Sequence, residues 1–164
     1  MIPTTLSDVA QVVSGSLVDS PNPHAMVTGA AADTRRVNPG DLFVAIVGAR
    51  ADGHDFAESA MSDGAVGVLG SRPTGHPTVV VDEPVLALGR LARHQLGRLP
   101  DAEVVAITGS SGKTSTKDLI AQLVSLRGPV VAPEGSFNTE VGLPLTVLQS
   151  DGDTRTVVLE MGAR

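Results

Sequence analysis

The sequence predicts an α/β protein, made of a small amino-terminal α/β domain and the start of a second domain with a mostly parallel sheet. Three observations lead to this prediction. Apolar runs of strand length alternate with helical patterns along the chain, as in βαβ units. Leu99-Pro100-Asp101 interrupts that alternation and is the best boundary, which gives domains at residues 1–99 and 100–164. A strand then restarts and runs directly into a glycine-rich turn at residues 108–112.

The composition excludes several classes of protein. The 164 residues leave room for one domain of ordinary size or two small ones, and 41% hydrophobic residues suffice for real cores. A net charge of −6 and only 2% aromatic residues argue against a nucleic-acid partner, which needs a basic face or stacking platforms. The absence of cysteine excludes disulfides and thiolate metal sites and fits a cytoplasmic location. No apolar run approaches the ~20 residues of a membrane span.

In the first domain, helical and extended patterns follow one another with turn residues between them. A first helix opens at Thr5, presents Leu6, Val9, Ala10 and Val13 on one face, and ends at Gly15. The further expected elements are a loop at 18–26, a weakly extended segment at 26–32, a buried strand at 42–47, a helix around 56–61, strands at 65–69 and 78–81, and a helix from Pro84.

Two polar segments of this domain are candidates for ligand binding. In Asp33-Thr34-Arg35-Arg36, an arginine beside hydrogen-bonding side chains is what a nucleotide diphosphate or a sugar needs, and the alternative is a solvated turn. Asp52 and His54 follow the strand at 42–47, at the carboxyl end where ligands gather in open α/β sheets. The alternative for His54 is a polar helix entry that Asp55 caps.

The stretch from Val104 to Thr116 predicts a strand, a phosphate-binding loop and a helix. Val104 to Ile107 is short, apolar and rich in β-branched residues, which suits a strand buried on both faces. Gly109 and Gly112 permit backbone angles that other residues avoid, so that consecutive amides can surround an anion. Apolar residues then recur at helix spacing, so the loop leads onto a helix N-terminus whose free amides favour phosphate. The apolar residues of this helix are Leu119, Ile120, Leu123 and Leu126.

Lys113 and Thr114 add a positive charge and a metal ligand to this loop. The Thr114 hydroxyl would bind Mg²⁺. The general P-loop pattern places a glycine where Ile107 stands, so the motif is the shorter form Thr-Gly-x-x-Gly-Lys-Thr. The alternative is an ordinary turn with Lys113 exposed to solvent, but the flanking strand and helix favour phosphate binding.

The segment after the predicted phosphate-binding helix contains a polar loop. Val130-Val131 forms a short strand, and residues 133–139 form a loop before an apolar segment. Asn138 in this loop either caps the following helix or faces a ligand at the edge of the sheet.

The last predicted strand, residues 156–159, ends at Glu160. A carboxylate at the end of an apolar parallel strand would lie beside the phosphate loop and would bind Mg²⁺ directly or through water. An acidic strand end alone is weak support. Together with Lys113 and Thr114 upstream, Glu160 is a candidate for the acidic metal ligand of a nucleotide site.

Three motifs together resemble the Mur ligases of peptidoglycan synthesis. They are Thr-Gly-Ser-Ser-Gly-Lys-Thr-Ser-Thr-Lys at 108–117, Phe-Asn-Thr-Glu-Val-Gly-Leu-Pro at 137–144 and Glu-Met-Gly-Ala at 160–163. In the amino-terminal half, segments 33–35, 39–45 and 52–56 resemble the family's UDP-substrate domain. The resemblance spans nearly the whole chain and is nearest to the members that join D-alanyl-D-alanine to UDP-N-acetylmuramoyl-tripeptide.

This resemblance implies an ATP-dependent amide-bond ligase. ATP phosphorylates the terminal carboxylate of the UDP-linked tripeptide, and the amino group of the dipeptide then attacks the acyl phosphate. The implied ATP-binding residues are Thr108, Gly109, Ser110, Ser111, Gly112, Lys113, Thr114 and Ser115. The implied catalytic residues are Lys113, Glu160 and Asn138, and Mg²⁺ is bound by Thr114 and Glu160. The substrate-binding candidates are Thr34, Arg35, Asp52, His54, Asn138 and Thr139.

The resemblance also implies a longer protein. Family members have three domains, and this chain would hold the first and the beginning of the second. We therefore expect an amino-terminal fragment, inactive by itself, of an enzyme that is monomeric at full length. The alternatives are a sibling of the family that adds another amino acid, a P-loop module that binds nucleotide or UDP-sugar without ligase activity, and another P-loop enzyme such as a small-molecule kinase.

Overall fold

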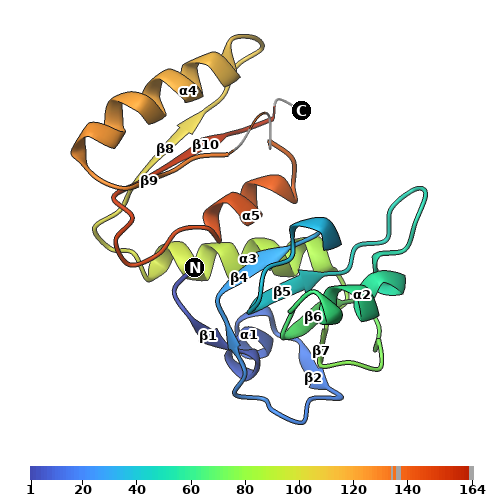
Figure 1. Ribbon diagram of the computed structural model, residues 1–164. Coiled ribbons are helices and arrows are strands. Elements are labelled where there is room, and N and C mark those ends of the chain that lie inside the picture. The colour runs from blue at the N-terminus through green and yellow to red at the C-terminus, as the bar shows by residue number, and fades with distance from the viewer. Residues whose placement is uncertain (134, 136–137, 163–164) are drawn as a thin grey trace. The chain divides into compact units, whose positions relative to one another are not determined.

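Figure 1 shows the protein as a computed structural model, which describes residues 1–133, 135 and 138–162. Contacts between residues group the chain into two compact units. One unit is Pro3–Leu91, called the first unit below; the second unit is Met1–Ile2 together with the described residues from Ala92 onward. This division falls within helix α3 (Pro84–Gly97), earlier than Leu99-Pro100-Asp101, and the domain boundary predicted there stays a prediction. In the described part of the chain, no helix has the length and hydropathy to cross a membrane.

The first unit is built on a five-stranded sheet. Its strands in spatial order are β2 (Ser16–Val18), β7 (Thr78–Val80), β6 (Gly67–Gly70), β5 (Asp41–Val44) and β4 (Gly29–Ala31). Strand β2 is antiparallel to β7, and the other neighbours are parallel. Two further short strands, β1 (Thr4–Thr5) and β3 (Met26–Val27), form a separate antiparallel pair. The α/β class is therefore confirmed for this unit.

Strand β5 ends earlier than the sequence predicts. The apolar run continues to Val47, but the paired strand stops at Val44. After Val44 the chain leaves the sheet and folds back on itself, and the N–H of Gly53 donates to the carbonyl of Ile46 at 2.9 Å. A Cβ atom at Gly53 would lie only 2.5 Å from the Ile46 nitrogen, so this close approach requires glycine.

The helices of the first unit follow the predicted order. They are α1 (Leu6–Val13), the 3₁₀ turns η1 (Thr34–Arg36) and η2 (Gly53–Phe56), α2 (Ala57–Ser62) and α3. The predicted apolar face of α1 is confirmed, since Leu6, Val9, Ala10 and Val13 are all buried. The helix ends at Val13, and Ser14, one residue before the predicted stop at Gly15, takes the left-handed conformation at φ 59°.

The two faces of the sheet carry different helices. Phe43 of β5 and Val68 of β6 pack with Ala57 and Ala60 of α2. Side chains alternate along a strand, so Gly67 points to the opposite face, where a Cβ would lie 2.7 Å from Leu6 of α1. Helices α1 and α2 therefore cover opposite faces, as an α/β layer structure requires.

The second unit has a three-stranded parallel sheet in the order β8 (Glu103–Ile107), β10 (Thr156–Glu160) and β9 (Val130–Val131). Helix α4 (Lys113–Val124), the 3₁₀ turn η3 (Ser125–Arg127) and helix α5 (Gly142–Val147) complete it. Figure 1 shows α4 and α5 on opposite sides of this sheet. The predicted strands at 104–107, 130–131 and 156–159 are confirmed, and so is the helix after the glycine-rich loop.

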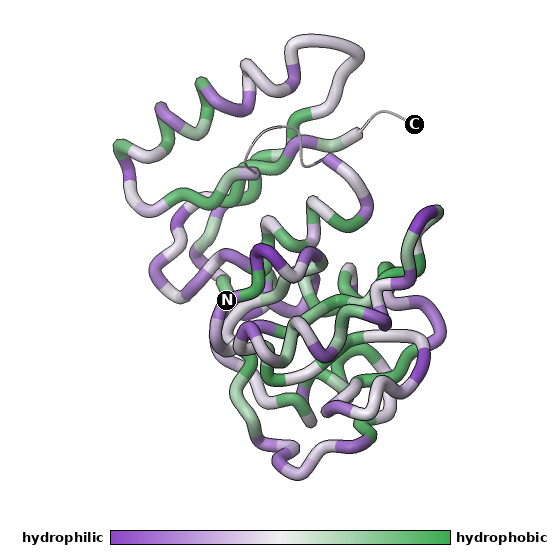
Figure 2. The backbone as a smooth tube through the Cα atoms, turned by 45° about the vertical axis from the view of Figure 1, so that its right-hand side comes forward, coloured by the Kyte–Doolittle hydropathy of each residue, from purple (hydrophilic) through white to green (hydrophobic). Residues whose placement is uncertain are grey.

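The prediction that the strand at 104–107 is buried on both faces is wrong for the described structure. All five residues of β10 are buried, whereas Val104 of β8 is 49% exposed. The reason is topological, because among the described strands β8 pairs with β10 alone and lies at the edge. Leu119, Leu123 and Leu126 are also exposed, and Figure 2 shows hydrophobic and hydrophilic residues alternating along α4.

Candidate functional site

The loop between β8 and α4 has the backbone that the sequence predicts. Gly109 has φ 146° and Gly112 has φ 74°, values that side-chain-bearing residues rarely adopt. Gly112 is the N-cap of α4, and the first helical hydrogen bond runs from the N–H of Thr116 to the Gly112 carbonyl. The N–H groups of Lys113, Thr114 and Ser115 therefore donate no hydrogen bond within the helix, and such groups at a helix N-terminus bind anions.

The predicted phosphate-binding residues lie along this loop and the first turn of α4. Thr108, Gly109, Ser110, Ser111 and Gly112 form the exposed connection, and Lys113, Thr114 and Ser115 open the helix. The Lys113 Nζ donates to the Gly109 carbonyl at 2.7 Å, so its ammonium lies over the loop. The structure therefore brings the loop and its lysine together.

Glu160 lies at the end of the central strand β10 and is only 2% exposed. The parallel register pairs it with Ile107, the last residue of β8 before the loop. The Thr114 hydroxyl donates to Glu160 Oε2 at 3.0 Å, and the Asn138 Nδ2 donates to Glu160 Oε1 at 3.0 Å. Three predicted site residues from different segments of the chain thus meet at one carboxylate.

Asn138 does not cap the helix that follows it. Helix α5 has Val141 at its N-cap position without a side-chain cap, and the Thr139 hydroxyl accepts the N–H of Gly142 at 2.9 Å. The Asn138 amide instead faces Glu160, so the capping alternative is wrong, and the contact of Asn138 with a ligand stays a prediction. The rest of the predicted loop at 133–139, namely residues 134, 136 and 137, lies outside the described residues, as do 163 and 164 in and after the Glu-Met-Gly-Ala motif.

The oxygen ligands at Glu160 suit a hard cation. A carboxylate and a hydroxyl are donors that Mg²⁺ accepts, and Mg²⁺ in nucleotide sites takes only one or two carboxylates with phosphate and water as its other ligands. The described residues contain no group of three or more His, Cys, Asp or Glu side chains placed to hold a metal. A cation here would therefore need the phosphates of a nucleotide as additional ligands.

In the first unit, Asp33 and Arg35 form an ion pair within one turn. Arg35 Nη2 lies 2.6 Å from Asp33 Oδ2, Arg35 Nε donates to Oδ1 at 2.9 Å, and the Arg35 side chain is 86% exposed. The hydrogen bond from Arg35 lowers the pKa of Asp33 from 3.8 to about 2. Thr34 lies in the same 3₁₀ turn, η1, which Asp33 caps through the N–H of Arg35. The roles of Thr34 and Arg35 in substrate binding stay predictions.

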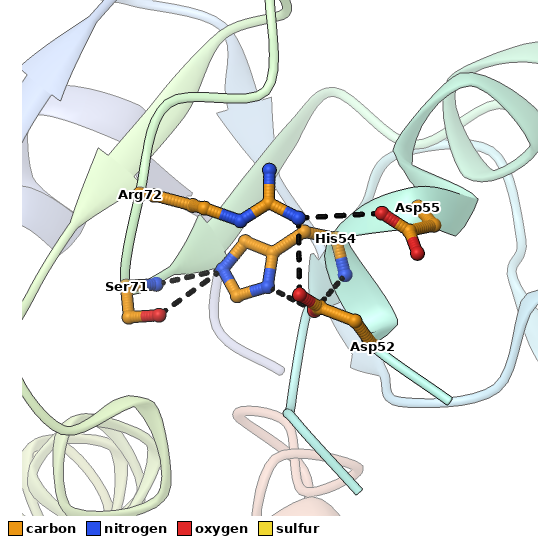
Figure 3. A network of polar contacts seen from close by, with 5 residues as sticks. All are labelled: Asp52, His54, Asp55, Ser71 and Arg72. Atoms are coloured by element: carbon orange, nitrogen blue, oxygen red, sulfur yellow. Dashed lines mark hydrogen bonds and ion pairs between the residues drawn. The ribbon is translucent and has the colours of Figure 1, made fainter. Parts of the chain in front are cut away.

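Asp52 and His54 belong to a larger polar network, which Figure 3 shows from close by. The His54 Nε2 accepts the backbone N–H of Ser71 at 2.9 Å, so the ring proton lies on Nδ1, which donates to Asp52 Oδ1 at 2.5 Å. The His54 side chain is fully buried, and both ring nitrogens have partners. The prediction that Asp55 caps the following helix is wrong, because α2 has Phe56 at its N-cap position without a side-chain cap. Asp52 instead caps the 3₁₀ turn η2, where its carboxylate accepts the His54 N–H at 2.9 Å.

Arg72 closes this network from the outside. Its Nη2 lies 3.0 Å from Asp52 Oδ2 and 3.3 Å from Asp55 Oδ1. Hydrogen bonds from the backbone and ring of His54, followed by that from Arg72, hold the pKa of Asp52 far below its ordinary range. Sequence reasoning missed Ser71 and Arg72, although both directly follow β6, whose carboxyl end lies beside that of β5.

Lys117 is a third residue whose place the sequence did not predict. It is the last residue of the motif at 108–117, for which no role is predicted, yet it is only 2% exposed in α4. Its distance of three residues from Thr114 is the available signal, since residues three apart share a helix face.

Two family models match the chain in succession. The model of the Mur ligase family, catalytic domain, matches residues 26–96, and the Mur ligase middle domain matches residues 107–164.

Relatives with known names match over the whole chain. It is 46% identical over 193 residues to the UDP-N-acetylmuramoyl-tripeptide–D-alanyl-D-alanine ligase of Mycobacterium leprae, which covers 100% of this chain and 37% of that protein. The ligase of the same name from Bacillus subtilis is 38% identical over 167 residues, covering 99% of this chain and 36% of the relative. The chain thus spans little more than a third of the length of these relatives.

Solved structures give the same picture. A crystal structure of MurF from Acinetobacter baumannii matches with a TM-score of 0.88 and 29% identity, over 98% of this chain and 36% of that one. The MurF ligase from Thermotoga maritima in complex with ADP matches with a TM-score of 0.70 and 38% identity, over 82% of this chain and 32% of that chain.

Proposed function

The chain belongs to the Mur ligase family, and on that basis we propose that it is the part of an ATP-dependent amide-bond ligase that binds a UDP-linked substrate and the phosphates of ATP. The proposed enzyme joins D-alanyl-D-alanine to UDP-N-acetylmuramoyl-tripeptide in peptidoglycan precursor synthesis, the reaction in the names of its relatives. A cytoplasmic location belongs to the same proposal, because the reaction consumes ATP. A monomeric full-length enzyme is proposed with it, on the family resemblance alone.

One observation carries the proposal for the ATP site. The buried Glu160 carboxylate accepts hydrogen bonds from Thr114, in the first turn after the glycine-rich loop, and from Asn138. A structural role alone does not require a carboxylate here, since a neutral side chain avoids the cost of burying a charge. A bound cation would compensate that cost.

The residues around the loop divide the work of binding ATP. Backbone amides of residues 108–112 and the start of α4 would surround the phosphates, with Ser110, Ser111 and Ser115 as further donors. Lys113 would turn from the Gly109 carbonyl to the β- and γ-phosphates. The similar ligase from T. maritima was solved in complex with ADP, which supports nucleotide binding by this chain.

Thr114 and Glu160 are the residues that would hold Mg²⁺. When bound, Mg²⁺ neutralises charge on the phosphates as the phosphoryl group moves. Glu160 would supply a fixed negative charge for it, and Thr114 a hydroxyl oxygen. The amide of Asn138 would keep the carboxylate oriented, and Thr139 would lie next to it near the transferred phosphoryl group.

The reaction needs alignment and charge neutralisation more than a protein nucleophile. The tripeptide carboxylate attacks the γ-phosphorus of ATP, giving an acyl phosphate and ADP. The amine of D-alanyl-D-alanine then attacks the acyl carbon and releases phosphate. Lys113 acts in this scheme by holding the transferred phosphoryl group in place.

The first unit would bind the UDP-linked substrate. Thr34, Arg35 and Asp52 are its proposed ligands, because they offer hydroxyl, guanidinium and carboxylate groups at exposed or half-buried positions. His54 is proposed in the same site, but as a residue that positions Asp52 and does not contact the substrate. Both of its ring nitrogens are occupied, so it supports Asp52 and leaves the direct contacts to the other three.

Isothermal titration of this chain, first with UDP-N-acetylmuramoyl-tripeptide and then with Mg-ATP, tests the proposal. We expect the chain to bind both ligands, with UDP-N-acetylglucosamine as the matched control that lacks the peptide. Failure of both titrations, in a chain that circular dichroism shows to be folded, would contradict the proposed function and favour another P-loop family.

A further inference from the structure

Lys117 is an unusual residue for the middle of an amphipathic helix. Lysine is almost never fully buried unless it is paired, yet Lys117 is 2% exposed, while Leu119 and Leu123 of the same helix are 62% and 66% exposed. Helix α4 therefore turns a lysine inward and two leucines outward. Lys117 shares its helix face with Thr114, three residues earlier, whose hydroxyl contacts Glu160.

The ammonium of Lys117 has a complete set of partners. Its Nζ donates to the Pro133 carbonyl at 2.8 Å and to the Gly135 carbonyl at 2.9 Å, and it lies 2.9 Å from Asp118 Oδ1. Two of these contacts are hydrogen bonds and the third is an ion pair, and all three are made to the protein itself. Lys117 therefore acts on the protein chain.

The two carbonyls lie shortly before Asn138 in the sequence. An extended chain spans at most about 3.6 Å per residue, so a fixed Gly135 keeps the Asn138 backbone within about 11 Å of it. On its other side, the Asn138 carbonyl would lie 3.0 Å from a Cβ at Gly162, just after β10. Asn138 is thus tethered within three residues of a carbonyl that Lys117 holds, and its own backbone approaches the end of the strand that carries Glu160.

We propose that Lys117 is a positioning residue for the ATP site: its ammonium fixes the carbonyls of Pro133 and Gly135 and so holds the Asn138 amide against Glu160. This inference rests on the proposed function for its consequence, which is a carboxylate oriented for Mg²⁺. The buried ammonium is needed because a neutral side chain of the same length leaves both carbonyls without their donor.

Nuclear magnetic resonance of the full chain tests the positioning directly, without any ligand. The side-chain amide signals of Asn138 report its bond to Glu160, and Glu160→Ala gives their positions when that bond is absent. In Lys117→Met, which keeps the length of the side chain but removes its donors, we expect the Asn138 signals to move to the positions seen in Glu160→Ala. Asp118→Asn is the matched control, because Asp118 is 56% exposed and contacts the same ammonium from outside.

Asn138 signals that stay at their wild-type positions in a folded Lys117→Met chain would overturn the proposal. If that variant does not fold, Lys117→Gln gives the same comparison, since its amide keeps donors but is too short to reach both carbonyls. Signals that move in Asp118→Asn as far as in Lys117→Met would also overturn it, because the exposed carboxylate would then matter as much as the carbonyls.

The effect on nucleotide binding is a separate measurement. Residues that orient a metal ligand change metal affinity by about 10- to 100-fold, so the gain in ATP affinity on adding Mg²⁺ is expected to fall about tenfold in Lys117→Met and to stay unchanged in Asp118→Asn. A wild-type chain that gains no affinity from Mg²⁺ would contradict the proposed function. The Asn138 signals would still decide the positioning role.

Discussion

Two polar clusters lie near the carboxyl ends of parallel strands, one in each unit, and they balance their charges differently. In the first unit, Asp52 accepts hydrogen bonds from the buried His54 and from the guanidinium of Arg72. In the second unit, the contacts of Glu160 described in the structure are with two neutral groups, the Thr114 hydroxyl and the Asn138 amide. The first cluster contains its own cation, whereas no cationic side chain among the described residues is paired with Glu160.

This difference teaches how to recognise a metal site among polar clusters. The edge of a parallel sheet gathers polar side chains in both units, so position alone does not assign a function. A carboxylate that already pairs with an arginine gains little from a metal ion. A carboxylate that is 2% exposed beside neutral donors is stabilised by a cation, and the adjacent loop is shaped for the phosphates that would bring one.

The largest effect is expected where the first cluster is broken. His54→Ala leaves the Ser71 N–H and Asp52 without their partner and opens a cavity, so we expect the free energy of unfolding of the first unit to fall by about 3 kcal/mol. Urea unfolding followed by the amide signals of β5 measures it. His76→Ala is the control, because His76 pairs with the exposed Glu58 and its loss is expected to cost about 0.5 kcal/mol or less. Equal losses in the two variants would show that the His54 network is not structural.

The next largest effect is expected in the phosphate loop, which lies next to the second cluster. Lys113→Ala removes charge-assisted hydrogen bonds to phosphate, so we expect Mg-ATP affinity to fall about 10- to 100-fold while the affinity for UDP-N-acetylmuramoyl-tripeptide stays the same. Calorimetry on the chain measures both, and Arg127→Ala, a change at the far end of the same helical segment in η3, is the control. Unchanged Mg-ATP affinity in Lys113→Ala would contradict the assignment of the loop.

Lowering the pH tests the first cluster separately, because its stability depends on the ionised carboxylate of Asp52. The pKa of Asp52 in the folded chain lies well below its ordinary value of 3.8, so this carboxylate stabilises the fold above pH 4. That stability is lost as the pH falls from 3.8 toward the folded pKa. We expect the urea midpoint to drop as the pH falls from 4 to 2, and to drop less in Asp52→Asn. Parallel curves for the two chains would contradict this account of the cluster.

The smallest effect on stability is expected at the exposed ion pair of the first unit. Arg35→Ala changes the free energy of unfolding by about 0.5 kcal/mol or less, because the arginine is 86% exposed. The pKa of Asp33 is expected to rise from about 2 toward 3.8, as a carboxyl titration by nuclear magnetic resonance would show. The affinity of this variant for UDP-N-acetylmuramoyl-tripeptide tests the proposed role of Arg35, which an unchanged affinity would contradict.

Local motifs and strand order made much of the second cluster predictable. The glycines of the loop impose their own backbone, and a helix follows them directly, so the loop conformation follows from residues 108–116. Glu160 was predictable because an apolar run ending in a carboxylate is typical of a central parallel strand. The contact between Thr114 and Glu160 follows once β8, which leads into the loop and α4, is the parallel neighbour of β10, which ends at Glu160.

The remaining features depend on contacts that a local pattern does not contain. The partners of His54 include Ser71, seventeen residues away, which reaches it only because β5 and β6 pair. The exposure of Val104 depends on β8 being an edge strand among those described. The leucine pattern of α4 favours an inward apolar face, whereas the structure turns Lys117 inward, and the carbonyls it binds come from a distant segment.

The central claim is that Glu160 organises a metal ion at the phosphate loop. The most direct test is the affinity of the chain for ATP, measured with excess Mg²⁺ and with EDTA, in the wild type and in Glu160→Gln. The wild-type chain is expected to gain about tenfold or more in affinity from Mg²⁺, and Glu160→Gln, which keeps the size of the side chain without its charge, is expected to gain little. An equal gain in the two chains would contradict the claim.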